Sequence, residues 1–219
     1  MTLLQMKTYC WDLLDDPNGQ YFTASNLTLR LNLGMIELQK RLISANKELF
    51  QDCVKTNTVV GQQAYSMPSD LFQLIRLEYY QAGQSATTLS SQIYPMTPNQ
   101  KDLVGSLNGA PQYYTTAKNN FVLWPTPDAI YEVHCEYNYQ VAPLSSDSDV
   151  PDMDDIWHEY IAILTTRDCL IKDGRPLAPI ESKMVRYEEL LKQVSIQRQA
   201  DQPRMVVTTA GDGGGGWSW

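Results

Sequence analysis

Several signatures of catalysis are missing from this chain of 219 residues. It has no GxxxxGK[ST] loop, no GxGxxG that follows a strand and opens a helix, no GxSxG elbow, no HExxH and no CxxC. With two histidines, His134 and His158, a metal site built from three imidazoles is excluded. We therefore expect a protein that is not an enzyme, with no catalytic residues, no metal and no cofactor.

Cysteines and long apolar runs are also scarce. The four cysteines, Cys10, Cys53, Cys135 and Cys169, are scattered without paired spacing, a pattern that predicts buried, reduced thiols. No apolar run approaches the roughly twenty residues that span a bilayer, and the first residues lack the apolar core of a signal peptide. These features predict a soluble protein of the cell interior, or a particle component assembled there, with no membrane partner.

Basic residues are outnumbered by acidic ones. The chain has 17 Lys and Arg against 25 Asp and Glu, a formal net charge of −8, and its isoelectric point is near 4.7. Such a surface repels the phosphate backbone, so broad non-specific binding of nucleic acid is not expected.

Four segments have helical periodicity, near residues 2–14, 24–55, 153–172 and 178–199. In the longest of them, apolar residues recur at steps of three and four and form one seam. The seam consists of Leu27, Leu31, Met35, Leu38, Leu42, Ala45 and Leu49. A helix of this length would extend about 45 Å, which is typical of a helical bundle.

Between these helices the period changes to two. Residues 131–139 alternate strictly, which predicts a half-buried strand. The inward set is Tyr131, Val133, Cys135, Tyr137 and Tyr139. Further strands are expected at 71–80, 113–117 and 121–124, and a hairpin at 57–67. A short helix is expected to start at 97–102.

The fold class that follows is α+β. A helical bundle is predicted from residues 1–56 together with 150–200, and a small antiparallel β domain, residues 57–149, is inserted into it. Residues 201–219 are predicted to form an extended, flexible C-terminal arm.

An acidic run precedes the third predicted helix. It contains Asp147, Asp149, Asp152, Asp154 and Asp155. The run lacks the glycine and the final Glu of a calcium-binding loop, so helix capping by Asp152 with Asp155 is the favoured interpretation. For His158, an ion pair with the acids of the same turn is expected. For His134, which lies on the polar face of its strand, exposure is expected.

The chain ends in a segment of different character. Met205, Val206 and Val207 form a β-prone run, residues 211–216 are mostly glycine, and Trp217 and Trp219 follow. Two tryptophans on a glycine tether cannot pack within a helix of their own. We therefore predict that the arm binds a neighbouring subunit or ring through these five residues.

The order of several short motifs is informative. Tyr-Ser-Met-Pro-Ser-Asp at Tyr65–Asp70 precedes a strand. Pro-Gln-Tyr-Tyr at Pro111–Tyr114 precedes a strand that ends in Leu-Trp-Pro-Thr-Pro. An alternating Tyr-rich strand, an acidic Pro-containing loop and a helix with a Trp in its first turn come next. Over roughly residues 5–200 this order resembles the head-to-tail adaptor (connector or neck) proteins of tailed bacteriophages.

The resemblance implies a structural virion protein. It implies a ring of copies, with twelve matching the twelve-fold portal, that joins the portal protein to tail or nozzle proteins and lines the channel through which genomic DNA passes without specific binding. Its location would be the head–tail neck, after assembly in the host cytoplasm. Two other hypotheses stay open: a carbohydrate- or peptide-binding module that uses the Tyr-rich strand, and a hydrolase with a pair of carboxylates.

Overall fold

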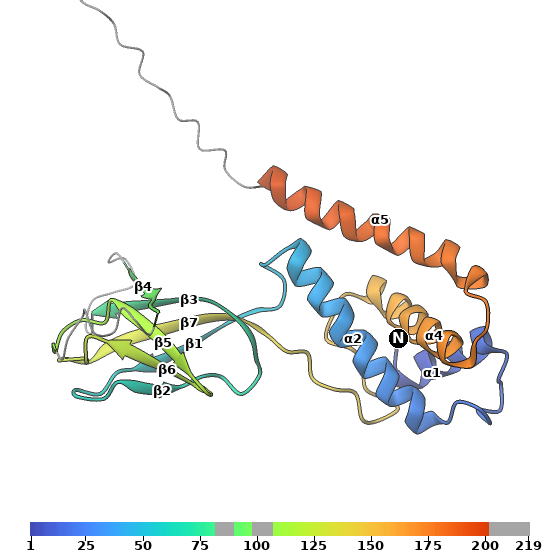
Figure 1. The fold of residues 1–219 in the computed structure, drawn as a ribbon, viewed down its shortest axis with the longest axis horizontal. Coiled ribbons are helices and arrows are strands. Elements are labelled where there is room, and N and C mark those ends of the chain that lie inside the picture. The colour runs from blue at the N-terminus through green and yellow to red at the C-terminus, as the bar shows by residue number, and fades with distance from the viewer. Residues whose placement is uncertain (82–89, 98–106, 202–219) are drawn as a thin grey trace, which may run out of the picture.

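The computed structural model describes residues 1–81, 90–97 and 107–201, with residues 195–201 given by their backbone alone. The fold is α+β and has two parts that lie end to end (Figure 1). In the described residues the helical part consists of α1 (Leu3–Leu14), α2 (Ala24–Ala45), the 3-10 turn η2 (Asp155–Trp157), α4 (His158–Asp173) and α5 (Ala178–Asp201). The β part consists of β1 (Gln51–Asn57), β2 (Ala64–Ser66), β3 (Leu71–Gln81), β4 (Ser91–Pro95), β5 (Tyr113–Ala117), β6 (Asn120–Trp124) and β7 (Tyr131–Tyr139).

The helical part surrounds one apolar core. The predicted seam of α2 is confirmed from Leu27 to Leu42, whose side chains are buried against α4 and α1. Gly34 lets α2 approach α4 closely, because a Cβ at this position would lie 3.2 Å from the Thr165 hydroxyl oxygen. The Thr2 and Thr23 hydroxyls accept backbone N–H bonds at the starts of α1 and α2, which stabilises both helix ends.

The prediction of one helix over residues 24–55 is wrong at its C-terminal end. Helix α2 ends at Ala45, and Asn46 takes an extended conformation. Leu49 continues the apolar period, but it packs on the helical core from a loop rather than from a helix. Strand β1 therefore belongs to the sheet, although it falls within the range 1–56 that was assigned to the helical bundle.

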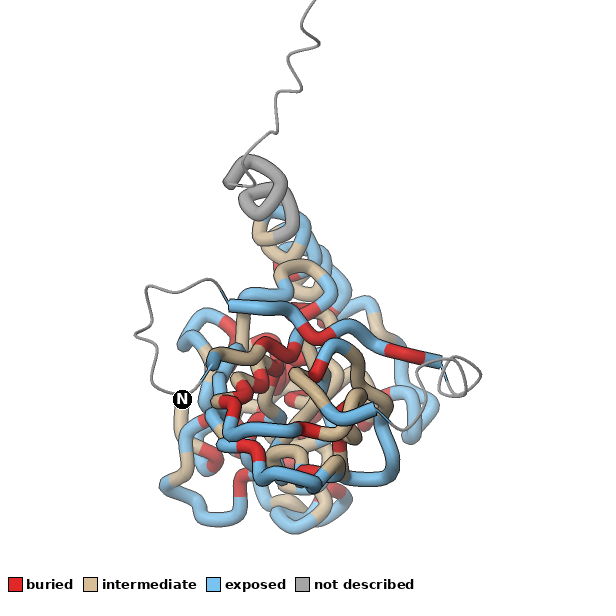
Figure 2. The backbone as a smooth tube through the Cα atoms, turned by 90° about the vertical axis from the view of Figure 1, so that its left-hand side faces the viewer, coloured by how far each residue is buried: buried red, intermediate tan, exposed pale blue. Residues whose placement is uncertain are grey.

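The sheet has the order β1-β7-β3-β4-β5-β6-β2, and only the β4–β5 pair is parallel. The predicted hairpin at 57–67 is wrong, because β1 pairs with β7 and β2 pairs with β6. The alternation predicted for β7 is confirmed from Tyr131 to Tyr137; at the end of the strand Asn138 is buried and Tyr139 is half-buried. Tyr65 of β2, the last strand in the order, shares this core with β7, the second strand in the order, so the sheet is curled. Buried and half-buried positions alternate along β6 and most of β7, and buried stretches are interspersed with exposed ones along the traced backbone (Figure 2).

Two predictions fall outside the described residues: the short helix start, of which only Thr97 is described, and the C-terminal arm beyond Asp201. Asp201 itself is the last residue of α5 rather than part of the arm. Among the helices that the structure describes, none has the length and apolar character needed to cross a bilayer.

Candidate functional site at the junction of the two parts

Amide side chains fasten the β part to the helical part. The Gln39 amide of α2 donates to the Tyr139 carbonyl (2.6 Å) and accepts from the Val141 N–H (3.3 Å). Two turns earlier on the same face, Asn32 makes the same pair of bonds with the backbone of Leu144. From the other side, Asn138 of β7 donates to two carbonyls of the loop that follows α2. The segment that leaves the sheet after β7 therefore runs along α2.

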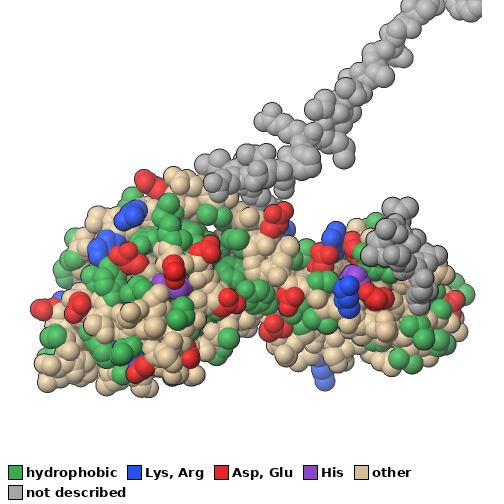
Figure 3. Space-filling model, turned by 180° about the vertical axis from the view of Figure 1, so that it is seen from behind, with side chains coloured by type: hydrophobic (Ala, Val, Ile, Leu, Met, Phe, Trp, Pro, Cys, Tyr) green, Lys and Arg blue, Asp and Glu red, His purple; other side chains and the backbone are tan. Residues whose placement is uncertain are grey.

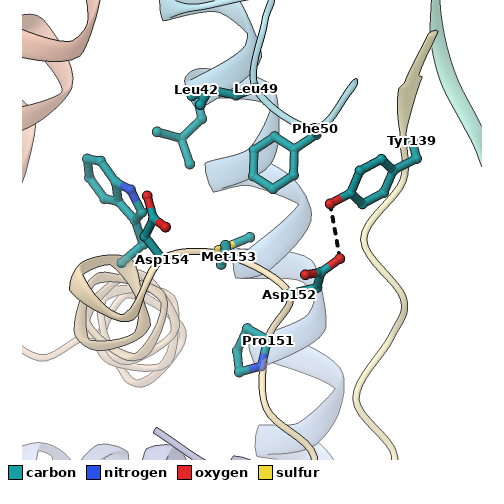
Figure 4. A pocket seen from close by; sticks show the side chains of 9 residues that line it. Leu42, Leu49, Phe50, Tyr139, Pro151, Asp152, Met153 and Asp154 are labelled. Carbon is teal, nitrogen blue, oxygen red and sulfur yellow. Dashed lines mark hydrogen bonds between the residues drawn. The ribbon is translucent and has the colours of Figure 1, made fainter. Parts of the chain in front are cut away.

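A cavity of about 390 Å³ opens at this junction (Figure 4). Its walls come from the end of α2, the loop that follows it, the end of β7, the acidic loop and η2. The lining residues are Leu42, Leu49, Phe50, Tyr139, Pro151, Asp152, Met153, Asp154 and Trp157. The cavity thus combines aliphatic and aromatic side chains with two carboxylates, the mixture that is found in sites for an amphipathic ligand.

One wall of the cavity is a ring pair. Phe50 and Tyr139 pack edge to face, with centroids 5.9 Å apart, and the Tyr139 hydroxyl donates to Asp152 at 3.0 Å (Figure 4). Burial, the bond to Asp152 and nearby carboxylates raise the pKa of Tyr139 to about 12, so the phenol keeps its proton and remains a donor. Phe50 has a φ of +59°, which few side chains adopt, and this turn directs the chain from α2 into β1.

The opposite wall is held by His158. This histidine is buried, and its Nε2 lies 3.0 Å from the Met153 carbonyl, which can only accept a hydrogen bond. Its Nδ1 lies 2.5 Å from the Met1 ammonium, which can only donate, and 3.2 Å from a carboxylate oxygen of Asp155, one of the acids expected from the sequence to lie beside it. His158 therefore fixes the backbone of the acidic loop where that loop faces the cavity.

The capping role proposed for the acidic run is wrong. Residue Asp154 occupies the N-cap of η2 without a side-chain bond to the turn, and Asp152 is bonded to Tyr139 instead. Asp147 pairs with Lys7 of α1. Asp149 accepts the backbone N–H groups of residues 145 and 146, and these bonds lower its pKa. Over residues 1–81, 90–97 and 107–201, no three potential ligands are grouped in a way that could hold a metal ion.

A second group of charges lies on the outer face of the sheet. Arg76 binds Glu136 through two bonds of 2.7 and 2.8 Å and contacts Glu78 at 3.1 Å. The Glu136 carboxylate is the main cause of the raised pKa of Arg76. One guanidinium thus holds both carboxylates, whereas the two carboxyl groups of a glycosidase flank the bond that is cleaved. The arrangement is that of a structural ion-pair network.

His134 lies beside this network and is half-buried, so the expected exposure is wrong. It contacts Glu132 at 2.6 Å and packs on the ring of Tyr80. The tyrosines of β7 contribute little to the surface, because Tyr131 and Tyr137 are buried. The described strand therefore offers no aromatic platform of the kind that a carbohydrate-binding module uses.

The cysteines follow the sequence prediction with one exception. All four are free thiols, and Cys10, Cys135 and Cys169 are buried, whereas Cys53 on β1 is exposed. Burial raises the pKa of the Cys10 and Cys135 thiols to about 12, so these side chains behave as small apolar groups.

The five residues predicted to bind a partner, Met205, Val206, Val207, Trp217 and Trp219, lie outside the described residues. The amides of the junction were not predicted. The positions of Asn32 and Gln39 give a weak indication of a shared role, because they are seven residues apart beside the apolar seam of the same helix. The position of Asn138 gives none, because its carbonyl partners are distant in sequence.

The fold and the junction define the class of this protein. It is a two-part α+β protein in which the charged and amide side chains described above make structural contacts. The chain matches the family model described as SU10 adaptor protein over residues 1–209. It therefore belongs to the SU10 adaptor protein family, a family of phage head-to-tail adaptors, and the resemblance drawn from the motif order is confirmed. Members of this family are structural virion components rather than enzymes. Among curated proteins, none matches this chain.

Proposed function

We propose that this protein assembles into a ring, with twelve copies to match the portal, which joins the portal vertex of the capsid to the tail. Membership of the adaptor family over residues 1–209 is the observation that carries the proposal. In the ring the helical parts stand side by side as bundles, and the β parts, inserted between the helices, project from them. The partners are the portal protein on one side and tail or nozzle proteins on the other.

A second apolar stripe on α2 supports contact between copies. Leu29 and Leu33 are 60% and 58% exposed. They lie on the side of the helix opposite the buried Leu27–Leu42 seam, as the 3.6-residue period requires. A helix that is apolar on two opposite faces needs a second partner to cover the outer one. Another copy of the helical part is the partner that a ring would supply.

The charge of the chain suits a channel through which DNA slides. Acidic side chains outnumber basic ones on the face seen in Figure 3, in both parts of the molecule. A lumen lined by such a surface repels phosphates, so DNA passes without adhering to the wall. Assembly would take place in the host cytoplasm, and the ring would remain in the virion neck. A β-part binding module or hydrolase is not favoured by the buried tyrosines and the Arg76 network.

Particle mass tests the ring and its contact surface together. Wild-type protein, measured by mass photometry with or without portal rings, is expected to form particles of a defined multiple of 24.9 kDa. The double variant Leu29→Ser/Leu33→Ser should remain a monomer with an unchanged melting temperature. The matched control is Val59→Ser/Val60→Ser, which changes two equally exposed residues of the β part. A wild type that stays monomeric with portal rings present would contradict the proposal.

A further inference from the structure

We infer that the junction cavity is the docking site for the C-terminal arm of a second copy, residues 202–219, with a tryptophan of that arm as the anchor. The inference rests on the proposed ring and assigns a role to a site that the ring alone does not require. Three observations carry it: the chemistry of the cavity walls, the free edge of β1 that leads to the cavity, and the composition of the arm.

The cavity walls suit an indole. Phe50 and Tyr139 offer aromatic faces and edges, and Met153 offers a thioether, all of which pack well on aromatic rings. An indole also carries one N–H that needs an acceptor when buried. The Asp154 carboxylate lines the same cavity, and within the described residues no side chain forms a hydrogen bond or an ion pair with it. Asp152 adds a second acceptor, and its carboxylate already accepts the hydrogen bond from the Tyr139 hydroxyl.

The edge of the sheet leads to the same place. Strand β1 is the first strand in the sheet order, so within the described residues only β7 pairs with it. The bonds from the Tyr139 N–H to the Phe50 carbonyl and from the Thr58 N–H to the Tyr131 carbonyl set the pattern of this pair. Even-numbered residues of β1 therefore face β7, and odd-numbered residues direct their backbone groups outward. The Cys53 N–H is bonded to Asp52; the backbone groups of Lys55 and Asn57 lie on the same open edge.

An exposed edge of this kind accepts an added strand. The run Met205–Val207 has the β-branched composition of such a strand. If it pairs antiparallel to β1, the arm runs from Asn57 towards Gln51 and reaches Phe50 at the cavity. Between Val207 and Trp217 the chain can extend roughly 30 Å, more than the roughly 20 Å that β1 spans. The glycine-rich residues 211–216 leave the approach of Trp217 or Trp219 unrestricted.

The occupant is assigned to a neighbouring copy because the ring places another cavity beside each arm. An exchanged arm also ties subunits together, whereas an arm folded onto its own chain would add nothing to the assembly. Helix α5, from which the arm continues, ends beyond the C-terminal end of α2 (Figure 1).

Thiol cross-linking in the full-length protein tests the inference. Cys53, the one exposed thiol among the four cysteines, is first replaced by Ser. Copies with Ser218→Cys are then mixed with differently tagged copies that carry Asp154→Cys, and a short bis-maleimide is added. The matched control is Asp173→Cys, an exposed aspartate at the opposite end of α4. Met153→Cys provides a second cavity position if the Asp154 variant does not fold.

We expect mixed cross-linked dimers with the cavity thiols and background yield with Asp173→Cys. Replacing Trp217 and Trp219 by Ala should lower the yield by at least about tenfold, as expected when interface anchors are removed. Yield equal to the control, or closure of a doubly substituted chain onto itself without mixed dimers, would overturn the inference. Particle mass is measured in the same samples. With portal rings added to these samples, rings without mixed dimers contradict only the docking of the arm, whereas monomers without mixed dimers contradict the ring as well.

Discussion

At the scale of single residues, three amides decide how the two parts are joined: Gln39 and Asn138, which are buried, and Asn32, which is half-buried. Asn32, Gln39 and Asn138 satisfy backbone groups of the segments that enter and leave the sheet. Backbone groups in such connections have no partner in a helix or a sheet, and each buried group left unsatisfied costs about 1–3 kcal/mol. The three amide side chains thus provide hydrogen-bond partners for backbone groups that regular secondary structure leaves unpaired.

Gln39→Leu should therefore destabilise the protein although the new side chain is apolar and of similar size. It leaves the Tyr139 carbonyl and the Val141 N–H without their partner, for an expected loss of about 2–4 kcal/mol in the free energy of unfolding. Urea denaturation measures the change. Lys40→Leu, at the neighbouring exposed position, is the control and should stay within about 0.5 kcal/mol of wild type. Equal free energies of unfolding for the two variants would contradict the role of Gln39 in joining the two parts.

Asp16 predicts a pH dependence. Its carboxylate accepts the backbone N–H groups of Phe22, Tyr21 and Gln20 at 3.0 Å, and these bonds lower its pKa. A carboxyl group with a lowered folded-state pKa stabilises the fold above its unfolded value, about 3.9, and this contribution is lost as the pH falls through the folded value.

Asp16→Asn should therefore lower the melting temperature at pH 7, and the difference from wild type should shrink as the pH falls below about 4. Melting curves at a series of pH values measure the effect. A difference that stays constant down to pH 2 would show that the charge of Asp16 does not stabilise the fold.

At the scale of elements, periodicity was a good guide wherever burial was one-sided. The seam of α2 and the alternation of β7 were both predictable, because each element buries one face against a single core. The end of α2 was not, since Leu49 keeps the helical period while it packs from a loop. The pairing of β1 with β7 was equally hidden, because it joins residues about eighty positions apart and depends on the whole sheet.

The seam gives a direct test of packing. Leu38→Ala and Leu42→Ala should each lower the free energy of unfolding by about 2–5 kcal/mol, because both side chains are buried in the core of the helical part. Leu33→Ala on the outer face of the same helix is the control, with an expected change within about 0.5 kcal/mol in the monomer. Wild-type stability of the seam variants would place these residues outside the core.

At the scale of the whole molecule, we propose separate roles for the folded parts and for the arm. Among the residues whose side chains are described, those of both apolar cores end at Val194, and a chain that stops after Asp201 should keep its melting temperature. The same truncation should weaken or abolish the joining of heads to tails, because the anchors Trp217 and Trp219 are removed. Complementation of an infection with the truncated gene measures the second effect. Normal titres of infectious particles would contradict the role of the arm.

The adaptor role itself was accessible from sequence through the order of motifs, none of which is specific alone. The junction cavity was not, because its walls come from five segments between Leu42 and Trp157. Such a site exists only once the sheet has been fastened to the helices by Gln39 and Asn138. The arm is the reverse case: its composition predicts a binding segment, and its residues beyond Asp201 lie outside the described part of the chain.

Electron microscopy of tail-less, DNA-filled heads provides the most direct measurement. Heads of the phage that encodes this chain are incubated with the purified protein, and the vertices are compared before and after. We predict a ring of added density at one vertex, the portal vertex, with the size expected for the assembled chain. Heads whose vertices are all unchanged, at protein concentrations where rings are present in solution, would contradict the role of this protein as a head-to-tail adaptor.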